Sequence, residues 1–152
     1  MTTDGMSVRL RTPADLDACA AALRLVHNAD RYPVDWPADP HGWLTPQGLL
    51  SAWVAVTEDR VLGHVGLADT PGGPEVTRLF VAPAARGRGL APLLLDTVRK
   101  AADGPVLLEV SDEGRAAVAL YERLGWRRVG STRARWLNAA GEPALLHHYV
   151  SP

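Results

Sequence analysis

A short basic turn, "ARGRGLAP" from Ala85 to Pro92, precedes an apolar helical stretch. Helix starts usually carry a Ser, Thr, Asp or Asn cap and acidic residues, so two arginines here indicate a bound anion. The first main-chain N–H groups of a helix lack intrahelical acceptors, and Gly87 and Gly89 would let such groups approach a ligand closely. Arg86 and Arg88 would add charge-assisted hydrogen bonds to phosphate oxygens. The turn therefore predicts a pyrophosphate site.

Two familiar phosphate loops do not fit this turn. A P-loop needs a lysine and a serine or threonine after its last glycine, where this chain has Leu90 and Ala91. A dinucleotide-binding fingerprint needs a third glycine, where this chain has Pro92. On spacing alone, the alternative is a glycine-rich surface turn whose arginines face water.

The elements around the turn alternate in a way typical of a mixed sheet. Apolar and polar residues alternate in "SVRLRT", and Thr12, Pro13 and Asp15 make a favourable helix start after it. The expected strands are residues 7–12, 52–57, 61–68, 75–81, 105–110, 126–137 and 144–150. The expected helices are residues 13–29, 86–102 and 114–125, with a short helical turn from Thr45. This order predicts helices on the faces of one sheet.

The composition is that of an ordinary globular domain. The chain has 152 residues, 47% of them hydrophobic and 22% charged, with a net charge of −1. We expect one domain over 1–152, with no nucleic-acid partner because no global basic field exists. No apolar run suggests a leader or a membrane span, so a cytoplasmic protein without a membrane partner is the expectation. We predict no metal, because His147 and His148 are adjacent on a strand and point to opposite faces.

Two motifs in the correct order resemble the GNAT superfamily of N-acetyltransferases, over Ser7 to Val150. The first, Q/R-x-x-G-x-G/A between the fourth strand and its helix, is matched by Arg86, Gly89 and Ala91. The second, A-x-x-x-Y-x-x-x-G-F after the fifth strand, is matched by Ala117, Tyr121 and Gly125, with Trp126 in place of Phe. The resemblance implies an α/β fold, with a mixed, mostly antiparallel sheet of about seven strands. It also implies helices on both faces and a splay between strands four and five.

The resemblance also implies acetyl-CoA as the co-substrate, lying in that splay. Its pantetheine arm would pair with the fourth strand and its pyrophosphate would lie on the basic turn. The residues so implied are Leu79, Phe80, Val81, Arg86, Gly87, Arg88, Gly89, Leu90, Ala91 and Pro92. Tyr121 resembles the tyrosine that protonates the CoA sulfur, and its alternative role is a core aromatic. Gly114 stands where the family often has an asparagine, and Ser111 or Asp112 are the residues that could replace that contact.

The proton of the attacking amine needs an acceptor, and three residues are candidates. Glu109 ranks first, because it lies in the apolar run "LLEV" and burial would raise its pKa. Ribosomal-protein N-terminal acetyltransferases of the same family use a glutamate at the matching position. The alternative for Glu109 is a rim position paired with an arginine such as Arg78. Glu75 ranks second, and His64 ranks third because a lone strand histidine is more often structural.

The segment "DRYPVDWPADPHGW" falls where family members bind their acceptors. Its aromatics, among them Tyr32 and Trp36, offer flat walls, and its aspartates, among them Asp35, offer negative charge. We expect these residues, together with Glu75, to suit a cationic amine. The alternative is a proline-rich lid over the first helix.

The combined expectation is an acetyl-CoA-dependent N-acetyltransferase that acts by direct transfer to a primary amine. A small-molecule amine is the first choice of acceptor and a peptide or protein N-terminus is the second. A non-catalytic acyl-CoA-binding module is the alternative from another class. The family resemblance also implies a homodimer.

Overall fold

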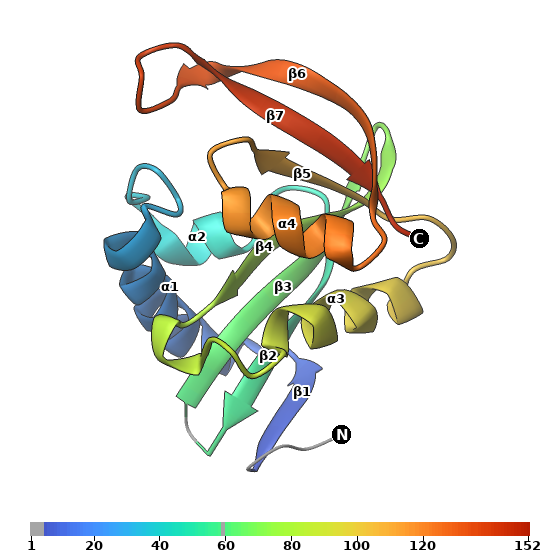
Figure 1. Ribbon diagram of the computed structural model, residues 1–152. Coiled ribbons are helices and arrows are strands. Elements are labelled where there is room, and N and C mark those ends of the chain that lie inside the picture. Colours follow the sequence, from blue (N-terminus) through green and yellow to red (C-terminus); the bar gives the residue numbers. More distant parts are fainter. Residues whose placement is uncertain (1–4, 59) are drawn as a thin grey trace.

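The computed structural model describes residues 5–58 and 60–152, and within them the chain forms one twisted sheet with helices on both faces (Figure 1). The strands are β1 (Met6–Leu10), β2 (Leu49–Thr57), β3 (Arg60–Thr70), β4 (Gly73–Val81), β5 (Leu107–Ser111), β6 (Arg127–Leu137) and β7 (Pro143–Val150). The helices are α1 (Leu16–Asp30), α2 (Pro40–Leu44), α3 (Leu90–Ala101) and α4 (Arg115–Arg123), with short 3-10 segments η1 (Pro13–Asp15) and η2 (Pro83–Ala85).

The sheet has the strand order β1-β2-β3-β4-β5-β7-β6. Every neighbouring pair is antiparallel except β4 and β5, which are parallel. The mixed, mostly antiparallel sheet that the sequence predicted is therefore confirmed, and so is its order of elements. None of the described helices has the length and hydropathy needed to cross a bilayer.

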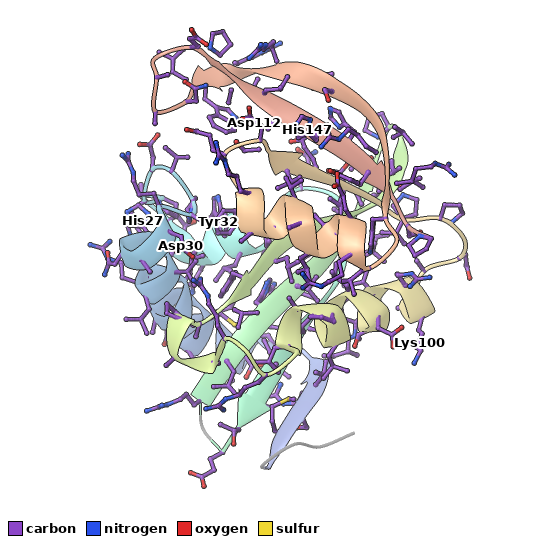
Figure 2. All side chains as sticks on the ribbon, viewed as in Figure 1. His27, Asp30, Tyr32, Lys100, Asp112 and His147 are labelled. Atoms are coloured by element: carbon purple, nitrogen blue, oxygen red, sulfur yellow. The ribbon has the colours of Figure 1, made fainter. Side chains whose placement is uncertain are left out.

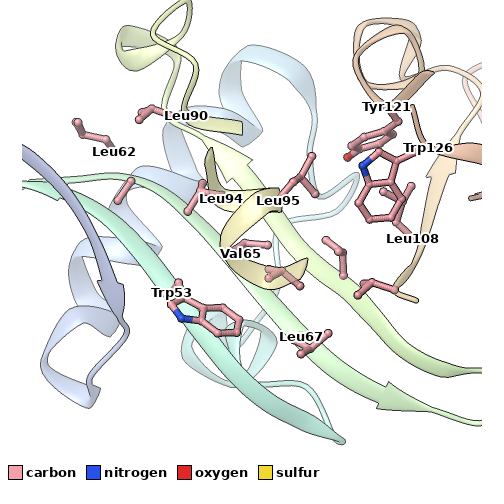
Figure 3. Packing of buried hydrophobic residues seen from close by; sticks show 14 of the residues in the cluster. Trp53, Leu62, Val65, Leu67, Leu90, Leu94, Leu95, Leu108, Tyr121 and Trp126 are labelled. Carbon is pink, nitrogen blue, oxygen red and sulfur yellow. The ribbon is translucent and has the colours of Figure 1, made fainter. Parts of the chain in front are cut away.

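Two hydrophobic cores lie on opposite faces of the sheet. The larger core joins the sheet to α3 and α4 and contains Val65, Leu94, Leu108 and Tyr121 (Figure 3). The smaller core joins α1 and α2 to β2, β3 and β4, with Leu23, Leu44, Val54 and Phe80 among its members. Because α3 buries Leu90, Leu94, Leu95 and Val98 at helical spacing, its amphipathic pattern explains both its existence and its orientation.

The start of α1 is held by its acidic residue. The Asp15 carboxylate accepts a hydrogen bond from the Thr12 backbone N–H at 2.7 Å and a bidentate pair from Arg9. The hydrogen bond from Arg9 is the largest cause that keeps the pKa of Asp15 well below its usual range. The helix start predicted at Thr12 is thus present, with one 3-10 turn before the α-helix proper.

Two local expectations were wrong. The short helix begins at Pro40, not at Thr45, because the Asp39 carboxylate caps it by accepting the Gly42 N–H at 3.1 Å. Strand β4 begins at Gly73, inside the "PGGP" segment, because Thr70 and Gly73 already pair across the turn.

Candidate active site

Strands β4 and β5 meet at one point and then separate. Glu75 and Leu107 are their only paired residues within the described chain, so β4 runs on from Val76 to Val81 with no strand partner on that side. The α1–α2 loop lies behind this opening and α4 crosses in front of it (Figure 1). The splay implied by the family resemblance is therefore present, and it is the natural centre of the site.

The basic turn lies at the open end of the splay, between β4 and α3. Gly87 and Gly89 have φ values of 81° and 76°, in the left-handed region, and no heavy atom lies within 4 Å of a Cβ built on either one. Within the described residues, the backbone N–H groups of Gly87, Arg88 and Gly89 have no hydrogen-bond acceptor. A glycine at each position thus exposes main-chain donors at the start of α3, where the helix dipole favours an anion.

The two arginines of the turn differ in their partners. Arg86 donates to the Asp30 carboxylate, at the end of α1, and to the Val81 carbonyl at 3.3 Å. Figure 2 shows Asp30 beside the end of α1, on the side of the turn. Arg88 is exposed and has no carboxylate within 4.0 Å among the described residues. Arg88 is therefore available to an incoming anion at once, whereas Arg86 has to share its guanidinium with Asp30.

Two buried tyrosines of this region have different surroundings. Tyr149 donates its hydroxyl to the Glu122 carboxylate at 2.7 Å and accepts from Arg128 at 3.1 Å, so its polar atom is satisfied within the protein. Tyr121 packs its ring against Trp126 with a centroid distance of 6.3 Å (Figure 3). Its ring also packs against Tyr149 at 6.2 Å. Within the described residues its hydroxyl has no hydrogen-bond partner, and the hydroxyl oxygen is not completely buried. Burial raises the pKa of Tyr121, which therefore stays protonated at neutral pH.

The carboxylates near the strand junction form a cluster with a histidine. Glu109 is exposed rather than buried, with 42% of its side chain accessible, and its carboxylate lies 3.7 Å from His148 Nδ1. The expected burial of Glu109 was wrong, because alternation along β5 turns Leu108 into the core and Glu109 away from it. Glu75 is half-buried, and burial followed by the charge of Glu109 raises the pKa of Glu75. The two carboxylates thus lie close enough to interact.

His64 is a structural residue in this geometry. Its side chain is fully buried and stacks on Phe80 with a centroid distance of 5.2 Å. Nδ1 donates to the Arg78 carbonyl at 2.8 Å, which leaves Nε2 to accept from Arg11 at 3.0 Å. Burial lowers the pKa of His64 to about 4. Both ring nitrogens are occupied, so His64 has no free lone pair for a substrate proton.

The aromatic residues of the acceptor segment divide into two groups. Trp36 packs on α1, with Arg24 over its ring at 4.7 Å and His27 at a centroid distance of 5.5 Å. Tyr32 instead meets Trp43 edge-on at 5.9 Å, and 37% of its surface remains exposed. Desolvation raises the pKa of the Tyr32 phenol to about 12, and the positive charge of the nearby Arg78 opposes that rise. Tyr32 therefore lies near Trp43 and Arg78, whereas Trp36 packs against α1.

The aspartates of the same segment are mostly engaged elsewhere. Asp30 pairs with Arg86 and Asp39 caps α2, while Asp35 is exposed. The charge that faces Tyr32 and Trp43 is instead positive, since the Arg78 guanidinium lies 4.1 Å from the centroid of the Trp43 ring. Sequence reasoning missed this role of Arg78, and its only signal was a positive charge in the middle of the strand "EVTRLFV".

The β4 residues implied for the pantetheine arm present backbone rather than side chains. Phe80 turns into the core beneath α1, while Leu79 and Val81 pack partly against the core beneath α3. Gly114 begins α4, where a Cβ would lie 3.2 Å from the Ser111 carbonyl oxygen. The Ser111 hydroxyl accepts the Glu113 N–H at 3.3 Å, and Asp112 is exposed beside it (Figure 2).

This geometry has counterparts among known proteins. Residues 20–126 match the family described as "Acetyltransferase (GNAT) family". The chain belongs to the GNAT acetyltransferase family, whose members use acetyl-CoA. The resemblance inferred from the two motifs is thereby confirmed.

The similar proteins are longer than this chain or distant from it in sequence. An uncharacterized protein of Mycobacterium leprae is 33% identical over 89% of this chain and 38% of its own length. A mycothiol acetyltransferase of Rhodococcus jostii is 36% identical over 57% of this chain and 32% of its own length. The chain thus spans about a third of the length of these curated relatives. The structure of Arabidopsis thaliana NAA60 in complex with acetyl-CoA has a TM-score of 0.74 at 19% identity, covering 95% of this chain and 97% of that one.

Proposed function

We propose that this chain is an acetyl-CoA-dependent N-acetyltransferase that transfers the acetyl group directly to a primary amine of a small molecule. Family membership supports the reaction class. The observation that carries the proposal is the Tyr121 hydroxyl, which has no hydrogen-bond partner within the described residues and belongs to α4, the helix that crosses in front of the splay (Figure 1).

The turn residues fit the co-substrate. Acetyl-CoA supplies an activated acetyl thioester, and its pyrophosphate needs donors without partners. The N–H groups of Gly87, Arg88 and Gly89 meet that need, and Arg88 adds a free guanidinium. The exposed edge of β4 from Val76 to Val81 offers main-chain groups to the amide-bearing pantetheine arm.

Glu109, Glu75 and Tyr121 are assigned to the two proton transfers of the reaction. A carbon–nitrogen bond forms as the carbon–sulfur bond breaks, so the amine loses a proton and the departing sulfur gains one. We assign the first proton to Glu109, through a water molecule, with Glu75 beside it as a second acceptor favoured by its raised pKa. We assign donation to the sulfur to Tyr121. Holding amine and thioester side by side supplies much of the rate.

Two other readings compete with this one. A peptide N-terminus as acceptor is supported by the likeness to ribosomal-protein N-terminal acetyltransferases at Glu109 and Tyr121. A small amine is favoured because Tyr32 and Arg78 both contact Trp43, which ties the segment after α1 to β4 at the splay. A non-catalytic acyl-CoA-binding module would bind acetyl-CoA without turnover.

The test is Tyr121→Phe, with Tyr149→Phe as the matched control. We expect Tyr121→Phe to lower kcat by about 100-fold in a thiol-release assay against an amine panel. The dissociation constant for acetyl-CoA by calorimetry should change by less than about threefold, because the ring and its packing stay. Tyr149→Phe should keep kcat, since that hydroxyl bonds Glu122 and not substrate.

An unchanged kcat in Tyr121→Phe would reject the role of Tyr121. Tight acetyl-CoA binding without turnover on any amine or peptide would instead favour the binding module.

A further inference from the structure

A β-bulge places one arginine in the wall of the splay. The register of β3 and β4 shifts between His64 and Gly66, and Arg78 has a φ of 53° at this point. Non-glycine residues rarely occupy the left-handed region unless their surroundings hold them there. The buried His64 supplies that restraint, because its Nδ1 bonds the Arg78 carbonyl and its Nε2 is bonded by Arg11. The backbone at Arg78 is therefore fixed before any ligand arrives.

The Arg78 side chain is fixed as well, with only part of its hydrogen-bonding capacity used. Nε donates to the Trp43 carbonyl at 2.8 Å, and the guanidinium carbon lies over the Trp43 ring, 4.1 Å from its centroid. Nη1 has a long contact of 3.4 Å to the Thr77 hydroxyl. Within the described residues Nη2 has no hydrogen-bond partner, so N–H groups of the guanidinium remain for a ligand, and a guanidinium can bind a carboxylate through two parallel hydrogen bonds.

The charge of Arg78 is not balanced by the protein. Within residues 5–58 and 60–152, no carboxylate lies within 4.0 Å of its guanidinium. Arg78 is half-buried, and desolvation lowers its pKa. The carboxylates of the site, Glu75 and Glu109, gather near the junction of β4 and β5. The splay is thus positive beside Trp43 and negative at its closed end.

We propose that Arg78 binds a carboxylate of the acceptor, so that the substrate of this chain is an amine that also carries a carboxylate, as an amino acid or its derivative does. This inference rests on the proposed function, and it names the acceptor class. The carboxylate lies in the Arg78 fork against Trp43 and Tyr32, and the amine is directed toward Glu75 and Glu109. This arrangement replaces the purely cationic acceptor expected from the aspartates of the α1–α2 loop.

The first experiment compares acids with neutral analogues. A panel of α-amino acids and the matching α-amino amides is assayed with acetyl-CoA by thiol release. We expect kcat/KM to be about 10- to 100-fold higher for acids than for amides in the unmodified protein. Arg78→Gln should lower kcat/KM for acids by a similar factor and leave amides within about threefold. Arg24→Gln is the matched control, because Arg24 also lies over a tryptophan but outside the splay.

A second experiment does not need turnover. Calorimetry in the presence of CoA compares N-acetyl amino acids with their amides as product-like probes. We expect the acids to bind at least about tenfold tighter, and Arg78→Gln to abolish the difference while keeping CoA affinity. If Arg78→Gln does not fold, Arg78→Lys keeps the charge without the fork and should lose part of the preference.

The outcomes separate the two proposals. Equal use and equal binding of acids and amides would overturn the role of Arg78 while leaving the transferase proposal intact. Acid-selective binding without acetylation of any amine would keep the role of Arg78 and remove the transferase proposal. Loss of CoA affinity in Arg78→Gln would assign Arg78 to the co-substrate instead, and so contradict this inference.

Discussion

Replacing His64 with phenylalanine should lower the stability of the fold near neutral pH and make that stability less dependent on pH. His64 is fully buried and neutral, with one hydrogen bond to the Arg78 carbonyl and one from the Arg11 guanidinium. His64→Phe keeps the ring stacked on Phe80 but removes both bonds. A neutral bond contributes about 1 kcal/mol and a charge-assisted one about 1.5–3 kcal/mol. We therefore expect a loss of about 3 kcal/mol near pH 7.5, or roughly 6–12 °C in Tm.

The pH dependence gives the sharper test. Burial lowers the pKa of His64 to about 4 in the folded chain. Between about pH 6.5 and pH 4, His64 is therefore protonated in the unfolded chain but neutral in the folded chain. The stability that neutral His64 contributes is thus present above pH 6.5 and is lost as pH falls toward 4. The loss amounts to about 2.5 kcal/mol by pH 4.5, at about 1.4 kcal/mol per pH unit.

The assay is urea unfolding of both proteins between pH 4.5 and 8. The difference in unfolding free energy should shrink from about 3 kcal/mol at pH 7.5 to under about 1 kcal/mol at pH 4.5. His41→Gln is the control, because His41 is 48% exposed and its partner among the described residues is the exposed Asp17. A difference between His64→Phe and the unmodified protein that stays constant across this range would refute the reasoning.

Two further predictions concern the site. Asp30→Asn should tighten acetyl-CoA binding by up to about fivefold in calorimetry, because it frees Arg86 from an exposed ion pair; weaker binding would mean that Asp30 holds Arg86 in its productive position. Glu109→Gln should lower kcat/KM by about 100-fold, while Glu75→Gln should retain most of the activity. If the pH–rate profiles instead show the large loss in Glu75→Gln, then Glu75 is the base.

The parts of the site that depend on local spacing could be predicted from the sequence. Gly87 and Gly89 adopt positive φ directly before the amphipathic helix that their neighbours predicted. Tyr121 lies on the expected helix, one turn before the left-handed Gly125. These features need only neighbouring residues, so propensity and periodicity suffice to find them.

The features that depend on distant pairing could not be predicted. Arg78 faces the α1–α2 loop because a β-bulge shifts the register of β4 against β3. No residue type in "EVTRLFV" predicts that shift. The aspartates of the acceptor segment were expected to face a cationic amine, but Asp30 pairs with Arg86, which lies 56 residues further along the chain. The capping role of Asp39 was accessible, since Asp followed by Pro is a common helix start.

The uneven distribution of the two cores has a consequence for how the molecule opens. Strands β2, β3 and β4 are packed from both faces, whereas β5 and β7 contribute to the larger core alone. Strand β6 contributes no residue to either core and is exposed along nearly all of its length. Segments with little buried apolar surface exchange their amide protons through low-energy fluctuations. The C-terminal hairpin is thus the first cooperative unit to detach, and a molecule caught in that partly opened state keeps its N-terminal layers assembled.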